Sequence, residues 1–239
     1  KFLAECGVCS RRHADDLIET GKVFVNEKPA VLGMRIDPEN DKVRFDNKAI
    51  TKDQKMVYYA FYKPKGVVTT AEDEEDRKTV LDFFPKEPRI FPVGRLDKNS
   101  EGLLILTNDG ELTQILTHPS FEHKKEYEVK IKNQKAKGKI SMQNVKLLEQ
   151  RFLSGLNIDS KLMKVDKIEL NFHTFDFKLL TFNLVLHTGH NRQIRKMCDR
   201  MGLEVLKLKR IGVGNLKLDS LGLKPGEYKT IKKSDIVNK

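Results

Sequence analysis

The sequence lacks any apolar run of about 18 residues, the length that a helix needs to cross a bilayer. Only three cysteines occur, Cys6, Cys9 and Cys198. An odd number of thiols without a secretory signal argues against a disulfide framework. These absences predict a cytoplasmic protein that has no membrane partner.

Signatures of several enzyme classes are also absent. The sequence has neither a Walker-type phosphate loop nor a Gly-x-Ser-x-Gly nucleophile elbow. Cys6 and Cys9 have the spacing of half a zinc site, but no second cysteine pair completes it, so we expect small buried residues instead. His187 and His190 could bind a metal or RNA, although polar residues at the end of a strand are the favoured interpretation.

Positive charge is what the chain has in excess. Lys and Arg number 45 against 34 Asp and Glu, which gives a formal charge of +11. Residues 1–50 contain equal numbers of basic and acidic residues, so the whole excess follows them. This distribution favours a polyanionic partner, and nucleic acid is the first candidate.

The first 50 residues predict a compact unit of two helices and a hairpin. Gly7 ends a short apolar helix, and Ser10 caps a second helix that Gly21 ends. Strands are expected over 22–25, 30–31 and 42–45. Arg11 and Arg12 lie in the first turn of the second helix, where cations oppose the helix dipole, so a phosphate backbone would explain them.

This order of helix, helix and Val-Phe-Val-Asn hairpin resembles the alpha-L motif, a small RNA-binding module first known from a primary-binding protein of the small ribosomal subunit. We therefore expect an RNA-binding domain over 1–50. A polar linker is expected over 51–56, and a catalytic domain over 57–239.

The stretch from Arg89 to Gly110 carries the candidate chemistry. Arg95 and Asp97 are two residues apart before an apolar strand at 103–106, so they can face one site. A glycosidase would need two carboxylates flanking one bond. Because Glu101 and Asp109 are poorly placed for that, we expect a single catalytic acid.

The remaining pattern predicts an α+β fold with a mainly antiparallel mixed sheet and flanking helices. Alternating apolar residues around Tyr127 predict a half-buried strand. The expected strands are 57–62, 67–70, 103–106, 124–131, several within 164–186, 205–209 and 216–218, and the expected helices are 80–84, 111–116, 134–148 and 192–201.

Four separated segments together resemble the RsuA-like ribosomal RNA pseudouridine synthases. They are Lys-Pro-Lys-Gly at 63–66, Gly-Arg-Leu-Asp at 94–97 with its continuation to Gly110, Lys-Glu-Tyr-Glu-Val at 125–129, and Gly-His-Asn-Arg-Gln-Ile-Arg-Lys-Met at 189–197. Cys-Ser-Arg-Arg at 9–12 and the run at 191–198 look more like the large-subunit enzymes of that group.

The resemblance implies isomerisation of a uridine in ribosomal RNA without a cofactor or metal. It implies that Asp97 acts on the sugar–base linkage, as nucleophile or as base, that Tyr127 stacks on the base, and that Arg195 pairs with Asp97. Leu208 corresponds to an apolar residue of the pocket floor. Electrostatics supports the pairing of Arg195 with Asp97, because a cation beside a desolvated carboxylate keeps it ionised. An arginine can bind the carboxylate through two parallel hydrogen bonds.

Binding to RNA is expected to depend on phosphate contacts and on unpaired target nucleotides. We expect a monomer that acts on ribosomal RNA or on pre-ribosomal particles. A non-catalytic RNA-binding or assembly factor and a metal-dependent RNA hydrolase are the alternatives. The predicted RNA contacts are Arg95, Arg11, Arg12, Lys63, Lys124, Lys125, Arg192, Lys196, Lys207, Lys209 and Arg210.

Overall fold

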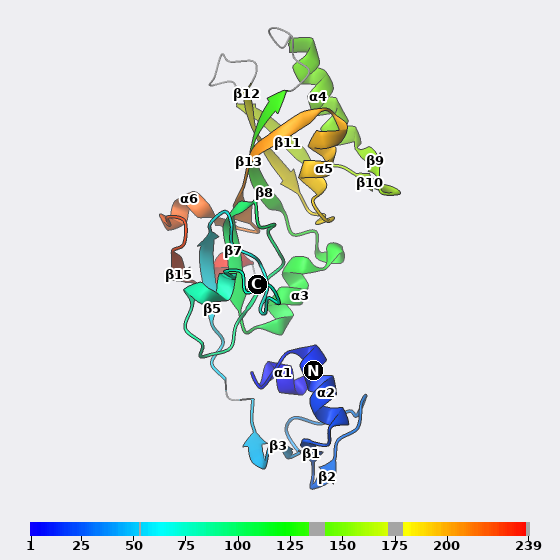
Figure 1. Ribbon diagram of the computed structural model, residues 1–239, viewed down its shortest axis with the longest axis vertical. Coiled ribbons are helices and arrows are strands. Elements are labelled where there is room, and N and C mark those ends of the chain that lie inside the picture. Colours follow the sequence, from blue (N-terminus) through cyan, green and yellow to red (C-terminus); the bar gives the residue numbers. More distant parts are fainter. Residues whose placement is uncertain (53, 134–141, 172–178, 238–239) are drawn as a thin grey trace.

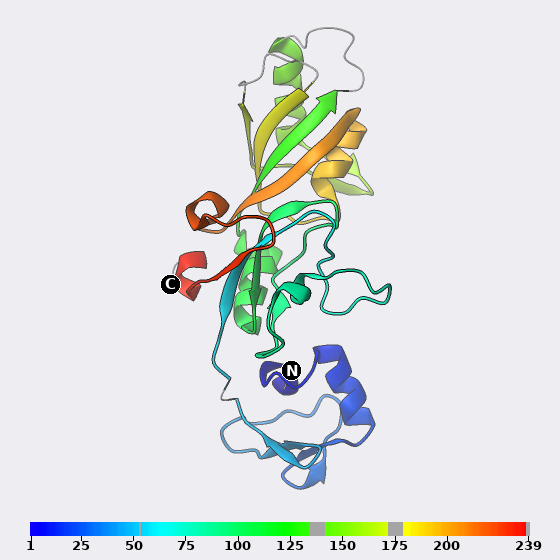
Figure 2. The same ribbon diagram turned by 60° about the vertical axis from the view of Figure 1, so that its left-hand side comes forward.

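The computed structural model describes residues 1–52, 54–133, 142–171 and 179–237. A small N-terminal unit lies at one end of the molecule, and a larger unit built on one long sheet forms the rest (Figure 1). The rotated view shows the same division into two units (Figure 2). No helix among the described residues is long and apolar enough to span a membrane.

The N-terminal unit has its own sheet and its own apolar core. The strand order is β2-β1-β3-β4, and the core includes Leu3, Leu17 and Val23. The Ser10 hydroxyl accepts a hydrogen bond from the His13 backbone N–H at 3.2 Å, so the predicted helix cap is confirmed. The elements are α1 (Phe2–Glu5), α2 (Arg11–Glu19), β1 (Val23–Val25), β2 (Lys28–Pro29), β3 (Val43–Phe45) and β4 (Lys48–Ile50).

The larger unit is built on a 9-stranded sheet of order β11-β12-β8-β13-β7-β5-β15, with β14 paired to β13 and β6 to β7. Every pairing is antiparallel except that of β13 with β7. The strands are β5 (Tyr58–Lys63), β6 (Phe91–Pro92), β7 (Glu101–Thr107), β8 (Lys125–Asn133), β11 (Lys167–Asn171), β12 (Leu179–Leu186), β13 (Leu203–Val213), β14 (Leu216–Lys217) and β15 (Tyr228–Thr230).

Helices flank this sheet, and β9 pairs with β10 as a separate hairpin. In Figure 1, α4 and α5 lie along the upper half of the sheet and α3 lies beside its lower half. The elements are η1 (Val80–Phe83), α3 (Gly110–Thr117), η2 (Pro119–Phe121), α4 (Met142–Ser154), β9 (Leu156–Ile158), β10 (Lys161–Met163), α5 (Gln193–Arg200), α6 (Leu218–Leu221) and α7 (Lys233–Ile236). The α+β prediction is therefore confirmed.

Strand β7 runs through the middle of the core. Residues 103–106 are each at most 1% exposed, because Leu104 and Leu106 pack into one apolar cluster while Leu103 and Ile105 pack into another. A strand covered on both faces reads as a continuous apolar run. That explains why this segment shows no alternation in the sequence.

The approach of β13 to β7 depends on a glycine. Gly102 has φ +110°, and a Cβ atom there would lie 2.2 Å from the Arg210 carbonyl oxygen. Gly102 pairs with Arg210 across the parallel β7–β13 contact. This crossing sets the separation between the loop that precedes β7 and the side chains of β13, which together frame the pocket described below.

Several predicted elements differ from the structure. Residues 67–70 were expected to form a strand but make only one isolated bridge, between Val68 and Thr79. The predicted loop at 212–214 continues β13 as far as Val213, because that segment pairs with β8 and β14. The predicted helix over 134–148 overlaps α4, which continues beyond the predicted end to Ser154; residues 134–141 and 172–178 lie outside the described part of the chain.

Candidate active site

A pocket opens where four segments meet. The loop before β7 contributes Arg95 and Asp97, β8 contributes Tyr127, and β13 contributes Leu208. The loop from β12 into α5 supplies the fourth side, including Arg192. Two of the residues predicted for catalysis, Asp97 and Tyr127, therefore line one pocket with Leu208, predicted for the pocket floor. Of the predicted RNA contacts, Arg95 and Arg192 line it.

Asp97 has two cationic neighbours. Its Oδ2 atom lies 3.8 Å from Arg195 Nε and also 3.8 Å from Arg192 Nη1. The side chain of Arg195 is 14% exposed and that of Arg192 is 49% exposed. The structure thus brings the predicted pair of Asp97 and Arg195 together, and it adds Arg192, which the sequence had assigned to RNA.

Arg195 does not hold Asp97 bidentately, so that part of the prediction is wrong. Its Nη2 atom donates to the Asn99 carbonyl at 2.8 Å and to the Ser100 hydroxyl at 3.2 Å. The Nε atom is buried and has no hydrogen-bond partner among the described residues. Burial, followed by the nearby Arg192 charge, lowers the pKa of Arg195. One guanidinium group therefore braces the loop and still faces the carboxylate.

The position of Arg192 depends on its backbone and on the next residue. Arg192 has φ +53°, in the left-handed region, directly before α5. Gln193 is buried; its Oε1 accepts from the Thr188 hydroxyl at 3.0 Å and from the His190 N–H at 3.2 Å. Its Nε2 donates to the Lys164 carbonyl at 2.8 Å. Sequence reasoning missed this role, for which Gln in the Asn-Arg-Gln run is the only signal.

Tyr127 and Leu208 give the pocket its flat, apolar side. Tyr127 is 9% exposed and Leu208 is 6% exposed, and Leu186 from the end of β12 also lines the pocket. Strand β8 lies between β12 and β13, so Tyr127 is opposite Leu184 on one side and Arg210 on the other. A planar ring could stack here beside the carboxylate.

Lys63 was predicted to contact RNA, and the structure contradicts this. Its side chain is completely buried, and Nζ donates to the carbonyls of Pro64 at 3.1 Å, Asp97 at 3.2 Å and Ser100 at 2.8 Å. Burial lowers its pKa to about 8. No phosphate can reach this ammonium group, whose role is to hold the loop that carries Asp97.

Arg210 is the second wrong RNA assignment. It is 3% exposed, and its Nε donates to the Leu103 carbonyl at 2.6 Å while Nη1 donates to the Arg95 carbonyl at 3.4 Å. The guanidinium group of Arg210 therefore ties β13 to β7 and to the loop before it. The sequence of a motif does not distinguish a buried basic residue from an exposed one.

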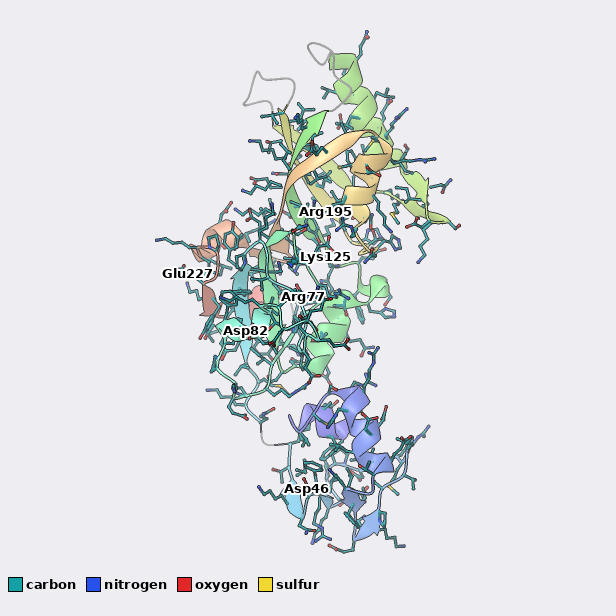
Figure 3. All side chains as sticks on the ribbon, in the orientation of Figure 1. Asp46, Arg77, Asp82, Lys125, Arg195 and Glu227 are labelled. Atoms are coloured by element: carbon teal, nitrogen blue, oxygen red, sulfur yellow. The ribbon has the colours of Figure 1, made fainter. Side chains whose placement is uncertain are left out.

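Lys125 has a comparable anchoring role at the other side of the pocket. It is partly buried, and Nζ donates to the carbonyls of His123 at 3.3 Å and His187 at 3.2 Å. Burial lowers its pKa. Lys125 at the start of β8 and Arg195 in α5 both lie in the middle of the larger unit (Figure 3). The contact of Lys125 with RNA stays a prediction.

The other predicted RNA contacts lie outside the core. Lys196 pairs with Asp159 at 2.5 Å, and Lys207 pairs with Glu101 at 3.3 Å and with Glu128 at 3.6 Å. Lys209 Nζ lies 5.4 Å from the centre of the Tyr62 ring. Four further cations have exposed side chains, and their contacts with RNA stay predictions: Arg11, Arg12, Arg95 and Lys124.

The candidate metal ligands have other surroundings. His187 Nδ1 lies 2.8 Å from Asp166 Oδ1, and Cys9 is 8% exposed in the N-terminal core. Within the described residues no group of three or more His, Cys, Asp or Glu side chains could hold a metal ion.

Fold and site together define a class of enzyme. One carboxylate faces two guanidinium groups beside an aromatic side chain, a combination suited to a planar base on an anionic backbone. With a separate helix-and-hairpin unit in the same chain, this describes an enzyme that modifies RNA.

Comparison with known families identifies the kind of modification. The sequence model of the RNA pseudouridylate synthase family matches residues 57–200, and that of the S4 domain family matches residues 1–43. The chain therefore belongs to the RNA pseudouridylate synthase family. Both resemblances drawn from the sequence are confirmed.

Relatives cover nearly the whole chain. "Ribosomal large subunit pseudouridine synthase B" of Bacillus subtilis is 36% identical over 97% of this chain and 94% of its own length. "Dual-specificity RNA pseudouridine synthase RluF" of Escherichia coli K12 is 35% identical over 100% of this chain and 76% of its own length. A solved "pseudouridylate synthase" structure, 25% identical, superposes with a TM-score of 0.63 and covers 98% of this chain and 96% of that one.

Proposed function

We propose that this protein isomerises specific uridines of large-subunit ribosomal RNA to pseudouridine. The observation that carries the proposal is the carboxylate of Asp97, which two guanidinium groups face at 3.8 Å in a pocket that Tyr127 and Leu208 also line. The name of the Bacillus subtilis relative, which matches over 97% of this chain, supports the choice of large-subunit RNA.

The reaction exchanges one bond for another within the same nucleotide. The bond between N1 of uracil and C1′ of ribose breaks, the base turns, and C5 bonds to C1′. C5 then loses its hydrogen and N1 carries one, so atoms and electrons balance without a cofactor or metal. Asp97 acts on the sugar–base linkage as nucleophile or as base. Both roles need an ionised carboxylate, and Arg195 and Arg192 each place a positive charge 3.8 Å from it.

The base must leave its stack to reach Asp97. In this proposal the Tyr127 ring supports the flipped uracil, and stacking of this kind contributes roughly 1 to 3 kcal/mol per base. Leu208 and Leu186 supply the apolar contacts. Arg95, exposed at the pocket, binds a phosphate of the target nucleotide or fills the space that the flipped base leaves.

The N-terminal unit positions the RNA. Arg11 and Arg12 bind phosphates, and we propose the division of the chain into a module over 1–50, a linker over 51–56 and a catalytic unit over 57–239. We also propose that the protein works as a monomer in the cytoplasm. There its substrates are ribosomal RNA and assembling particles.

Incubation with large-subunit ribosomal RNA, both naked and in particles, followed by mapping of pseudouridine, tests the proposal. We expect new pseudouridine with the unaltered protein and none with Asp97→Asn. RNA binding without isomerisation by either form would instead support a non-catalytic assembly factor.

A further inference from the structure

The loop between α3 and β8 presents an aromatic ring to solvent. Phe121, at the end of η2, is 50% exposed. The His118 ring lies 6.3 Å from it at an interplanar angle of 76°, and the His123 ring lies 6.5 Å from it at 28°. Three aromatic rings thus gather on a surface loop that neither the family match nor the proposed chemistry assigns to a role.

The loop holds this arrangement through its own hydrogen bonds. The Phe121 N–H donates to the His118 carbonyl at 3.2 Å, and His118 Nδ1 lies 2.7 Å from the Ser120 hydroxyl. The His118 N–H in turn donates to the Gln114 carbonyl at the end of α3, at 2.9 Å. A half-exposed ring fixed in this way loses little conformational entropy when a ligand stacks on it.

The loop is continuous with the pocket. A Cβ atom on Gly94, the neighbour of Arg95, would lie 3.7 Å from the Thr117 side chain at the end of α3. On the other side, Lys125 joins the His123 carbonyl to that of His187, two residues before the pocket residue Gly189. Phe121 therefore lies on a loop whose two ends adjoin the segments that carry the pocket residues Arg95 and Gly189.

We propose that Phe121 is a stacking platform for an unpaired nucleobase of the substrate RNA, outside the pocket that takes the target uridine. An exposed aromatic ring among cations is the combination that binds single-stranded nucleic acid, and here Lys124 and Arg95 supply exposed cations on the same loop and beside it. A stacked neighbour would hold the RNA open while the target base leaves its stack. The inference rests on the proposed function, which makes RNA the substrate.

Substitutions at Phe121 test the platform with a naked ribosomal RNA fragment that contains the modified site. Phe121→Ala is expected to weaken binding between about 5-fold and 150-fold, the range for loss of one stacked base. Phe121→Leu keeps an apolar side chain without a π face and should bind as weakly as Phe121→Ala, whereas Phe121→Tyr should bind as tightly as the unaltered protein. Leu153→Ala, which alters a 41% exposed apolar residue on α4, is the matched control and should bind normally.

Three results would overturn the platform: normal binding by Phe121→Ala, normal binding by Phe121→Leu, or weaker binding to ribosomal particles alone, which would indicate a protein partner. A different result would contradict the proposed function. In that case the unaltered protein makes no pseudouridine, although Phe121→Ala still weakens RNA binding. If the unaltered protein binds no RNA, both proposals are wrong.

Discussion

Replacing Gly102 by alanine tests how the pocket is assembled. The new Cβ atom would lie 2.2 Å from the Arg210 carbonyl oxygen and 2.6 Å from the Arg210 nitrogen. Ordinary contacts begin near 3.4 Å, so β13 and β7 must separate by about 1 Å. Neither neighbour is a flexible side chain, and the backbone itself has to move.

Two free-energy costs add in Gly102→Ala. A side chain at φ +110° is strained, at a cost of roughly 1 to 3 kcal/mol, and overpacking costs roughly 1 to 3 kcal/mol more. Gly66→Ala separates them, because Gly66 has φ +93° but open space around its Cβ position. Gly110→Ala, with open space and no positive φ, is the neutral control.

Thermal unfolding of the three variants gives the comparison. For a chain of this size each kcal/mol lowers Tm by roughly 2 to 4 °C. Gly102→Ala should therefore melt about 2 to 12 °C below Gly66→Ala, and Gly110→Ala should melt with the unaltered protein. A displacement of about 1 Å at the site can also reduce activity about 100-fold. Equal melting of Gly102→Ala and Gly66→Ala would refute the argument that the β7–β13 contact requires a glycine.

Three further predictions follow from the charges. Arg195→Met should reduce kcat/KM more than Arg192→Met, because Arg192 is the more exposed of the two side chains. A charge pair at 3.8 Å contributes roughly 1 kcal/mol in water and roughly 4 kcal/mol near a protein surface. Steady-state kinetics that rank the two variants in the opposite order would contradict this. The pKa of Lys63 falls from 10.5 to about 8 on folding, so the folded state binds fewer protons than the unfolded state between these values. The free energy of unfolding, measured relative to Lys63→Met, should therefore rise between about pH 8 and pH 10, by up to ~1.4 kcal/mol per pH unit. Parallel pH profiles of the two proteins would contradict this prediction. Arg11→Gln should lower the salt slope of single-stranded RNA binding by about 0.7, and an unchanged slope would remove Arg11 from the phosphate contacts.

Buried cations organise this pocket as much as exposed ones. Lys63 holds the loop of Asp97, Arg210 joins β13 to β7, and Lys125 links the two loops at the pocket mouth. Each donates to backbone carbonyls, and hydrogen bonds from charged donors are stronger than neutral ones. The positive charge of the pocket walls is therefore partly structural.

Local motifs predicted the pocket residues well and the basic residues poorly. Asp97, Tyr127 and Leu208 could be found because each lies in a segment with a recognisable pattern. Lys63 could not be assigned correctly, because its partner carbonyls include Ser100, 37 positions away, and only the folded chain brings them together. The need for glycine at position 102 likewise comes from Arg210, whose backbone would collide with any side chain there.

Release of tritium from carbon 5 of uracil in large-subunit ribosomal RNA tests the central claim most directly, because that hydrogen leaves only when C5 bonds to the ribose. We expect release by the unaltered protein at the mapped sites. We expect none by Asp97→Asn, although RNA binding is retained. Release that persists with Asp97→Asn would contradict the assignment of Asp97, and no release by the unaltered protein from naked RNA or particles would contradict the proposed function.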